Sequence, residues 1–342
     1  MGWKKDELIS QSSHQTIILD RTYPRLTKLF GNQISAAFAL MSLLNSEKPD
    51  YLICYGYTLK PQMLLICWAI LTATQFALIG DANYFIDRPG KVKAIAKSFW
   101  LRWIVIKASA LIAIGTASTL FWQKYGATPS KIFRSVLAVD NQFFIAVAEK
   151  HAAESQRLRS RLGFGHRIVF LFVGRLVKRK NVDLIIRAAR HLDSEKYGIV
   201  IAGEGEDGAR LKHLAVNQPN IVFAGNITPA ELPVFYKMAD VLLLPADQEP
   251  WGLVINEAMA CGLAIIAYRH CGAAVDLVDA SNGVKLCSFS VEELVEAMKR
   301  LAHDESALRD MQAYSRLKIQ DWSIEKAAEG IVTAVGSTYR NT

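Results

Sequence analysis

The sequence predicts an α/β protein of two domains, each built on a parallel sheet with helices on its faces. The chain has 342 residues, which suits two domains of about 150 residues each. Two successive stretches alternate short apolar runs of strand length with longer segments of helical character, the pattern of parallel α/β domains. Since 51% of the residues are hydrophobic and 21% charged, the chain is not expected to be disordered.

The first alternation lies in residues 1–150 and is the less regular one. Its two longest apolar stretches, Met63–Ile79 and Leu101–Trp122, approach the length of membrane spans. The first divides into a helix and a buried strand, and the second contains charged residues, so we expect buried α/β elements. The predicted strands are Thr16–Leu19, Tyr51–Cys54, Phe76–Ile79, Ala110–Ile114 and Ile132–Val136.

The second alternation lies in residues 151–322, and its boundary with the first is expected within the charged helical stretch Ala148–His166. A last helix, 323–338, is expected to pack back on the first domain. The predicted strands are Ile168–Val173, Gly198–Ala202, Ile221–Ala224, Val241–Leu244 and Ala264–Ala267. The predicted helices are Val182–His191, Gly208–Val216, Pro229–Met238 and Val291–Ala302.

The excess of positive charge lies entirely in the first half of the chain. Residues 1–150 contain 17 Lys and Arg against 9 Asp and Glu, whereas residues 151–342 contain 23 of each. The segment Arg88–Lys107 has six basic residues and no acidic one, and its apolar residues fall on one face of a helix. These are Ile95, Phe99, Trp103 and Ile106. The segment is either a surface that binds an anionic membrane or an ordinary surface helix, and no nucleic-acid-binding module is recognisable.

Cysteine usage and the N-terminus bear on the compartment. The five cysteines have no metal-ligand spacing and suit a reducing environment. Met1–Ser13 lacks the apolar core of a signal peptide. We therefore expect a cytoplasmic protein, peripheral on the inner face of the membrane if Arg88–Lys107 binds lipid.

The stretch Glu249-Pro250-Trp251-Gly252-Leu253-Val254-Ile255-Asn256-Glu257 is the most informative part of the chain. An apolar strand precedes it, and good helix formers follow Gly252. A helix start presents unpaired backbone N–H groups and a partial positive charge, which suit a phosphate. A carboxylate on either side of that phosphate suits sugar hydroxyls.

Two further motifs follow predicted strands. Gly174-Arg175-Leu176-Val177-Lys178-Arg179-Lys180 follows the strand Ile168–Val173 and is rich in basic residues. Gly203-Glu204-Gly205 follows the next strand, but such turns are common and carry little information alone.

Together the three motifs resemble those of family 4 retaining glycosyltransferases (glycosyl transferases group 1): E-x7-E, G-R-L-x-x-x-K-G and G-x-G. The resemblance implies the GT-B fold, two Rossmann-like domains facing across a cleft. It implies that Glu257 binds ribose hydroxyls. The alternative is that Glu257 lies in the first turn of the helix and complements the helix dipole. It also implies that Glu249 lies near the transferred sugar. It implies that Arg175 and Lys180 contact the donor diphosphate, whose charge two cations can neutralise. The other implied donor-binding residues are Gly174, Gly203, Ile227, Gly252, Leu253 and Val254.

The chain departs from the family pattern at residue 181 and in its N-terminal domain. Asn181 replaces the usual Gly, and Asn tolerates a left-handed backbone better than most residues. No counterpart of the strand, Gly-rich loop and helix that open the family's first domain is recognisable, so the N-terminal domain is expected to be truncated. Asp81, after the strand Phe76–Ile79, is a candidate catalytic residue that meets the acceptor or the donor sugar; a turn or capping role is the alternative. No histidine occurs between His14 and His151.

The resulting hypothesis is a retaining hexosyltransferase. It would move a sugar from a nucleotide diphosphate sugar to a glycan or lipid-linked acceptor, in surface polysaccharide or glycolipid synthesis. Neither a cofactor nor a metal is expected, because cationic side chains take the place of a metal and no D-x-D triplet occurs in the sequence. The alternatives are a non-catalytic or degenerate nucleotide-sugar-binding protein and a nucleotide-sugar epimerase of similar fold.

Overall fold

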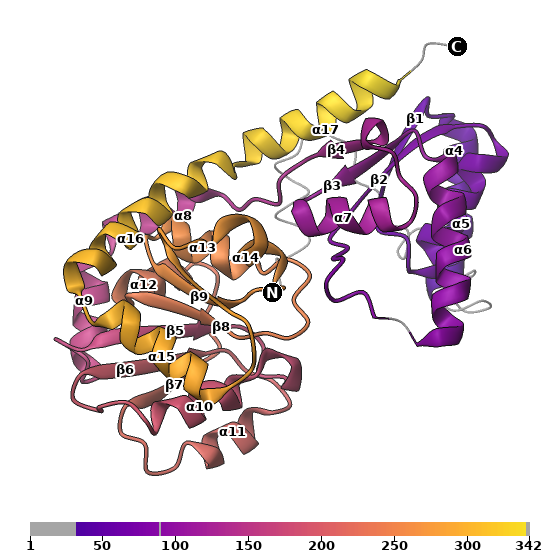
Figure 1. Ribbon diagram of the computed structural model, residues 1–342. Coiled ribbons are helices and arrows are strands. Elements are labelled where there is room, and N and C mark those ends of the chain that lie inside the picture. The colour runs from indigo at the N-terminus through magenta and orange to yellow at the C-terminus, as the bar shows by residue number, and fades with distance from the viewer. Residues whose placement is uncertain (1–31, 89, 340–342) are drawn as a thin grey trace.

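The computed structural model describes residues 32–88 and 90–339, which form two α/β lobes (Figure 1). Each lobe has a parallel sheet with helices on its faces, as the sequence predicts. The predicted strand Thr16–Leu19 and His14 lie outside the described residues.

The N-terminal domain contains a four-stranded parallel sheet in the order β1-β2-β3-β4. The central strand β3 is fully buried because helices cover both of its faces. The strands are β1 Tyr51–Tyr55, β2 Gln75–Gly80, β3 Ala110–Ala113 and β4 Ile132–Arg134. The helices are α4 Asn32–Glu47, α5 Lys60–Leu71, α6 Lys91–Lys107, α7 Thr116–Lys124 and the 3-10 helix η1 Pro129–Lys131.

The C-terminal domain contains a six-stranded parallel sheet in the order β10-β9-β8-β5-β6-β7. The chain order reverses at β5, which pairs with β6 on one side and β8 on the other. In such sheets a crevice forms at the carboxyl ends of the strands where the order reverses, and ligands bind there. The strands are β5 Ile168–Val173, β6 Tyr197–Ala202, β7 Ile221–Gly225, β8 Val241–Leu244, β9 Ala264–Tyr268 and β10 Gly283–Leu286.

The four helices predicted in this domain form as α10, α11, α12 and α15, with their bounds within three residues of the expected ones. The sixth strand, β10, has no counterpart among the strands predicted from the sequence. The helices are α8 Asn141–Lys150, α9 Ala152–Arg161, η2 Lys178–Lys180, α10 Val182–Ala189, α11 Gly208–Leu214, α12 Leu232–Met238, α13 Leu253–Ala260, α14 Gly272–Leu277, α15 Val291–Ala302, α16 Glu305–Lys318, η3 Ile319–Asp321 and α17 Ile324–Thr338.

The chain passes from one domain to the other at residues 135–140, before the stretch Ala148–His166 in which the sequence places the boundary. Helix α8 already packs against α12 and α13. The Asn141 amide at its start donates to the carbonyls of Ile319 and Trp322, both at 3.1 Å. Burial of the apolar face of α8 on the C-terminal domain therefore moves the boundary upstream.

Helix α17 runs from the C-terminal lobe back to the N-terminal one (Figure 1). It packs on β3 and β4, and its Ala334 is fully buried beside Ala77, Ala110 and Ile112. Its small residues allow this close approach, so one element of the C-terminal segment completes the core of the N-terminal domain.

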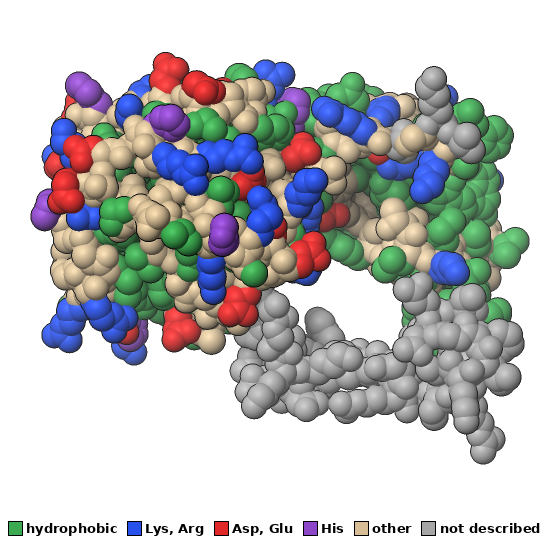
Figure 2. Space-filling model, turned by 90° about the horizontal axis from the view of Figure 1, so that it is seen from below, with side chains coloured by type: hydrophobic (Ala, Val, Ile, Leu, Met, Phe, Trp, Pro, Cys, Tyr) green, Lys and Arg blue, Asp and Glu red, His purple; other side chains and the backbone are tan. Residues whose placement is uncertain are grey.

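Helix α6 turns the apolar face predicted from the sequence outward. Ile95, Phe99 and Ile106 are 72%, 82% and 68% exposed. Hydrophobic side chains gather on the edge of the N-terminal lobe that points away from the other lobe (Figure 2). Among the described residues, no helix is both long and apolar enough to cross a bilayer.

One basic residue of α6 does not belong to that outer surface. Lys97 forms an ion pair with Asp87, whose carboxylate also binds Lys124 at 2.8 Å and the Tyr125 hydroxyl at 2.6 Å. The Asp87 side chain is only 5% exposed. Asp87 therefore fixes the loop after β2 on α6, through Lys97, and on α7, through Lys124.

Candidate active site

The predicted donor residues meet at the carboxyl ends of β5, β6 and β8. Gly174 follows β5 and donates its N–H to Ala202 at 3.0 Å, while Gly203 follows β6 and donates to Gly225 at 2.6 Å. A side chain on Gly203 would collide with the carbonyl of Gly174, and its φ of +131° also favours glycine. The two strand ends therefore approach closely enough to form one backbone-lined floor. Ile227, just beyond β7, is half-buried and packs against the core.

Lys180 and Glu249 form an ion pair across this edge of the sheet. Lys180 comes from η2 and Glu249 from the loop after β8, and their side chains are 12% and 13% exposed. Asn181 adopts the left-handed conformation expected from the sequence, with φ 52° and ψ 39°. Its amide also donates to the Pro245 carbonyl at 2.9 Å. The Lys180–Glu249 ion pair and the hydrogen bond from Asn181 to Pro245 thus hold the turn after β5 against the loop after β8.

Arg175 differs from Lys180 in having an exposed side chain. In the described part of the chain its guanidinium makes no hydrogen bond or ion pair. It follows Gly174 directly, just beyond the carboxyl end of β5. An exposed guanidinium at this position can bind an anionic ligand without breaking an existing contact.

Helix α13 begins at this edge. Its N-cap, Gly252, has φ +99°, and a Cβ there would lie 2.9 Å from the Cys271 sulfur. The first N–H groups of a helix have no acceptor within the helix, so those of Leu253 and Val254 are available to an anion. Gly252 therefore lets the helix start directly against the loop that carries Glu249.

Glu257 lies one turn inside α13 and is 5% exposed. One oxygen, Oε2, accepts a 2.6 Å hydrogen bond from the Tyr236 hydroxyl, and Oε1 accepts none from the described residues. Burial raises the pKa of the Glu257 carboxyl, and the Tyr236 bond offsets part of that rise. The first turn of α13 contains no acidic residue, so Glu257 is not the residue in the first turn that the alternative interpretation required.

Two residues inside the Glu249–Glu257 motif have a role that sequence reasoning missed. The Trp251 indole donates to Asn256 at 2.9 Å, and the Asn256 amide donates to the Leu137 carbonyl at 3.0 Å. Both side chains are buried. Since Leu137 lies between the domains, this chain of hydrogen bonds ties the start of α13 to the interdomain segment. The available signal in the sequence was a Trp and an Asn five residues apart within a largely apolar stretch, since buried polar groups are nearly always hydrogen-bonded.

The two domains touch along a seam next to Glu249. The Asp276 carboxylate of α14 accepts from the Thr116 amide at 2.9 Å, from the Thr116 hydroxyl at 2.5 Å and from Arg134 at 3.1 Å. Asp81, predicted for this edge, is exposed at the carboxyl end of β2, and no described contact joins it to Glu249. Asn83, two residues later, contacts the C-terminal domain instead.

A histidine lies at this seam although the N-terminal half offers none in the expected range. The ring of His270 stacks on Phe85 with centroids 4.9 Å apart and planes at 4°. Burial, followed by the charges of Arg269 and Arg88, lowers the pKa of His270. Beside the two rings lies a cavity of about 190 Å³. Its lining residues are Phe85, Ile86, Arg88, Asp247, Gln248, Tyr268 and His270.

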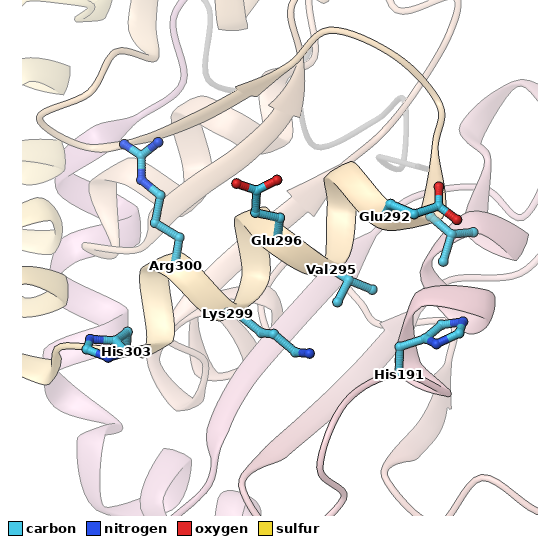
Figure 3. Close-up of a pocket in the computed structure, with 8 residues that line it drawn as sticks. His191, Glu292, Val295, Glu296, Lys299, Arg300 and His303 are labelled. Atoms are coloured by element: carbon cyan, nitrogen blue, oxygen red, sulfur yellow. The ribbon is translucent and has the colours of Figure 1, made fainter.

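A larger hollow, of about 700 Å³, runs along α15 (Figure 3). Its lining residues are His191, Val291, Glu292, Val295, Glu296, Lys299, Arg300 and His303. None of the predicted donor residues lines it, so its size does not make it the active site. In residues 32–88 and 90–339, no three His, Cys, Asp or Glu side chains are grouped as metal ligands.

Comparison with known proteins bears on this arrangement. Residues 154–318 match the family described as glycosyl transferases group 1. The GDP-mannose-dependent alpha-(1-6)-phosphatidylinositol monomannoside mannosyltransferase of Mycolicibacterium smegmatis is 32% identical over 160 residues, which are 43% of this chain and 42% of that protein. The D-inositol 3-phosphate glycosyltransferase of Acidothermus cellulolyticus is 32% identical over 193 residues, 52% of this chain and 42% of the relative. The chain thus spans less than half the length of these relatives.

Solved structures resemble the chain over most of its length. The Anabaena protein HepE in complex with UDP and glucose has a TM-score of 0.74 at 17% identity, covering 97% of this chain and 89% of that one. Sucrose-phosphate synthase from Thermosynechococcus elongatus has a TM-score of 0.70 at 17% identity, covering 94% and 80%. These likenesses establish the two-domain GT-B architecture, and the match in sequence lies over the domain that contains Arg175, Lys180 and Glu249. The chain has the GT-B fold, and its residues 154–318, just under half of its length, resemble the glycosyl transferases group 1 family.

Proposed function

We propose that this protein is a retaining glycosyltransferase that moves a sugar from a nucleotide diphosphate sugar to a glycan or lipid-linked acceptor. The observation that carries the proposal is the meeting of Lys180, Glu249 and the start of α13 at the strand ends where the sheet order reverses. With Arg175 just after β5, this edge offers two cations and helix N–H groups to a diphosphate, and one carboxylate to a sugar.

The chemistry follows from that charge arrangement. As the bond between sugar and diphosphate breaks, negative charge grows on the diphosphate, where Arg175, Lys180 and the N–H groups of Leu253 and Val254 stabilise it. The acceptor attacks on the face that the diphosphate leaves, and the departing phosphate takes the acceptor proton. Glu249 holds hydroxyls of the transferred sugar, and Glu257 holds the ribose through its unoccupied Oε1.

The names of related proteins suggest donors and acceptors to test. One relative is GDP-mannose-dependent and acts on a phosphatidylinositol mannoside, and a second is named for inositol 3-phosphate. The HepE structures contain UDP, glucose or UDP-glucose. GDP-mannose and UDP-glucose are therefore the first two donors to try, because they differ in both base and sugar.

A single series of measurements tests the proposal against its rivals. Calorimetry with UDP and GDP identifies the nucleotide, and product analysis with the matching donor follows the sugar. Transfer to an added acceptor, or to water, supports a transferase. A changed sugar still attached to nucleotide would indicate an epimerase, and tight donor binding without any product would indicate a binding protein.

We further propose that the outer face of α6 rests on an anionic membrane. The face combines exposed Ile95, Phe99 and Ile106 with exposed Lys93 and Arg102. Apolar side chains enter the interface while the basic ones pair with anionic headgroups. Such a position would bring the N-terminal domain to a lipid-linked acceptor and would make the protein peripheral on the cytoplasmic face.

A further inference from the structure

Asn83 is a buried amide of the N-terminal domain whose donors are used by the other domain. It lies in the loop after β2 and is 4% exposed. Its Nδ2 donates to the carbonyls of Pro250 at 3.2 Å and His270 at 3.0 Å. Its Oδ1 accepts from the Phe85 amide at 2.9 Å, which fixes the orientation of the amide group.

The two carbonyls that Asn83 binds belong to the loop that carries Glu249 and to the loop after the next strand. Pro250 is the next residue after Glu249 in the loop after β8, and His270 is in the loop after β9. The carbonyls before Pro250 are also bound: that of Gln248 by Arg179 at 2.6 Å, and that of Glu249 by the Gly272 amide at 3.4 Å. Of these three bonds, only the one from Asn83 comes from the N-terminal domain.

The seam around Asn83 is close-packed, which keeps the amide in place. Gly115 approaches Trp251 so closely that a Cβ there would lie 2.5 Å from the indole. Asp276 binds Thr116 and Arg134 on the same side. The N-terminal domain therefore presses on the residues that follow Glu249 through a fitted surface, in which Asn83 supplies the direct polar contact to the loop.

We propose that Asn83 is a positioning residue for Glu249. By holding the Pro250 carbonyl it fixes the backbone next to Glu249, so that the carboxylate reaches the transferred sugar only when the N-terminal domain is seated. The inference rests on the proposed function for the role of Glu249, but the hold of Asn83 on the loop is a separate property. A small displacement of a catalytic group typically costs about 100-fold in rate.

The test compares Asn83→Ala with Ser135→Ala. Ser135 is an equally buried side chain that donates to the Ala327 carbonyl of α17 at 2.8 Å, away from the Glu249 loop. Hydrogen exchange of peptides covering 247–256 and 268–273 reports on the loops, and nucleotide release from UDP-glucose and GDP-mannose reports on turnover. We expect N83A to lose protection in both peptides and to turn over about 100-fold more slowly, with UDP and GDP affinities within about twofold of wild type. S135A should keep the protection of both peptides and turn over at the wild-type rate.

Asn83→Asp adds a readout that a merely structural role would not change. A carboxylate facing two carbonyls is repulsive, and protonation returns one donor. Turnover of N83D relative to N83A should therefore rise as the pH falls through titration of the new carboxyl. Unchanged protection in N83A, or parallel pH profiles of N83A and N83D, would overturn the inference. If wild type releases nucleotide from neither donor, the proposed function fails, and hydrogen exchange alone decides whether Asn83 holds the loop.

Discussion

Lys180 and Glu249 are 69 residues apart in sequence and form an ion pair between the turn after β5 and the loop after β8. Each is therefore the counter-charge of the other. A diphosphate that binds Lys180 must share the ammonium with Glu249, whereas Arg175 has no such competitor among the described residues. The two cations, which the sequence presents as equivalent, differ in what a ligand must displace.

The ion pair predicts a double-mutant cycle. Glu249→Gln or Lys180→Met leaves a largely buried charge without its partner and should cost about 1–3 kcal/mol of unfolding free energy. The double variant should recover part of that loss, because neither charge remains. Turnover should fall about 100-fold or more in every variant. Urea denaturation and donor turnover measure the two effects, and additive stability losses would contradict the coupling.

Arg175→Ala should separate binding from stability. The side chain is exposed and unpaired within the described structure, so the unfolding free energy should change by less than about 0.5 kcal/mol. Loss of a charged contact should weaken UDP or GDP binding about tenfold or more in calorimetry. Arg300→Ala, an exposed guanidinium on α15, is the matched control. Equal nucleotide affinities for the two variants would exclude Arg175 from the site.

Asn181 provides a test of backbone conformation. A left-handed backbone costs an ordinary residue about 1–2 kcal/mol, and the bond to Pro245 contributes about 1 kcal/mol more. Asn181→Ala should be destabilised both by the cost of the left-handed backbone and by loss of the hydrogen bond. Asn181→Gly should lose only the hydrogen bond, because glycine adopts this conformation readily. Chemical denaturation should thus rank wild type above N181G and N181G above N181A. Equal stabilities of the two variants would mean that the turn relaxes to another conformation.

Glu257 predicts a pH-dependent stability. Burial raises the folded-state pKa of this carboxyl above its unfolded value, so the folded protein holds the proton more tightly than the unfolded chain. The resulting stabilisation is complete below the unfolded pKa and disappears as the pH rises through the folded pKa. Glu257→Gln cannot ionise and should gain stability relative to wild type from pH 4 to pH 7. A pH-independent difference in melting temperature would show that Glu257 titrates normally.

The variant E257Q also tests the proposed ribose contact. A neutral amide accepts weaker hydrogen bonds than a carboxylate, so nucleotide affinity should fall although stability rises at neutral pH. Tyr236→Phe, which removes the donor to Oε2 and leaves Oε1 unchanged, should alter stability more than nucleotide affinity. Unchanged nucleotide affinity in E257Q would show that Glu257 does not bind the ribose.

The outer face of α6 is tested on vesicles of anionic and neutral lipid. Ile95→Ser with Phe99→Ser removes two largely exposed apolar side chains and should lower the partition coefficient about tenfold or more. Lys93→Gln with Arg102→Gln should lower binding to anionic vesicles only, and added salt should have the same effect. Leu317→Ser, exposed to 63% on α16, is the control. If the wild-type protein binds to neither type of vesicle, the membrane proposal is wrong.

Local patterns in the sequence foretold much of the architecture. Continuous apolar runs such as Ile168–Val173 predict buried parallel strands, and nine of the predicted strands lie within the described residues as β1 to β9. Asn181 was expected to accept a left-handed backbone, and it does. These features depend on residues close together in the chain, where sterics and the pattern of burial act directly. The strand β10 was not predicted, because a segment of four residues is too short to show a distinct alternation of apolar and polar residues.

Other features depend on which distant segments meet. The sequence grouped Lys97 with the other basic residues of Arg88–Lys107, but in the structure Lys97 pairs with the buried carboxylate of Asp87. It marked Asp81 at the domain edge, yet Asn83 makes the contact, because the direction of a loop side chain depends on the surface opposite it.

The sequence by itself determined two parallel-sheet domains, the motifs at the strand ends and the basic, apolar-faced helix, since each follows from local spacing. Only the tertiary structure decided that Lys180 pairs with Glu249, that Glu257 is buried against Tyr236 and that Asn83 holds the loop beside Glu249. Those contacts join residues tens to more than a hundred positions apart. Their geometry depends on packing between elements, which no local pattern encodes.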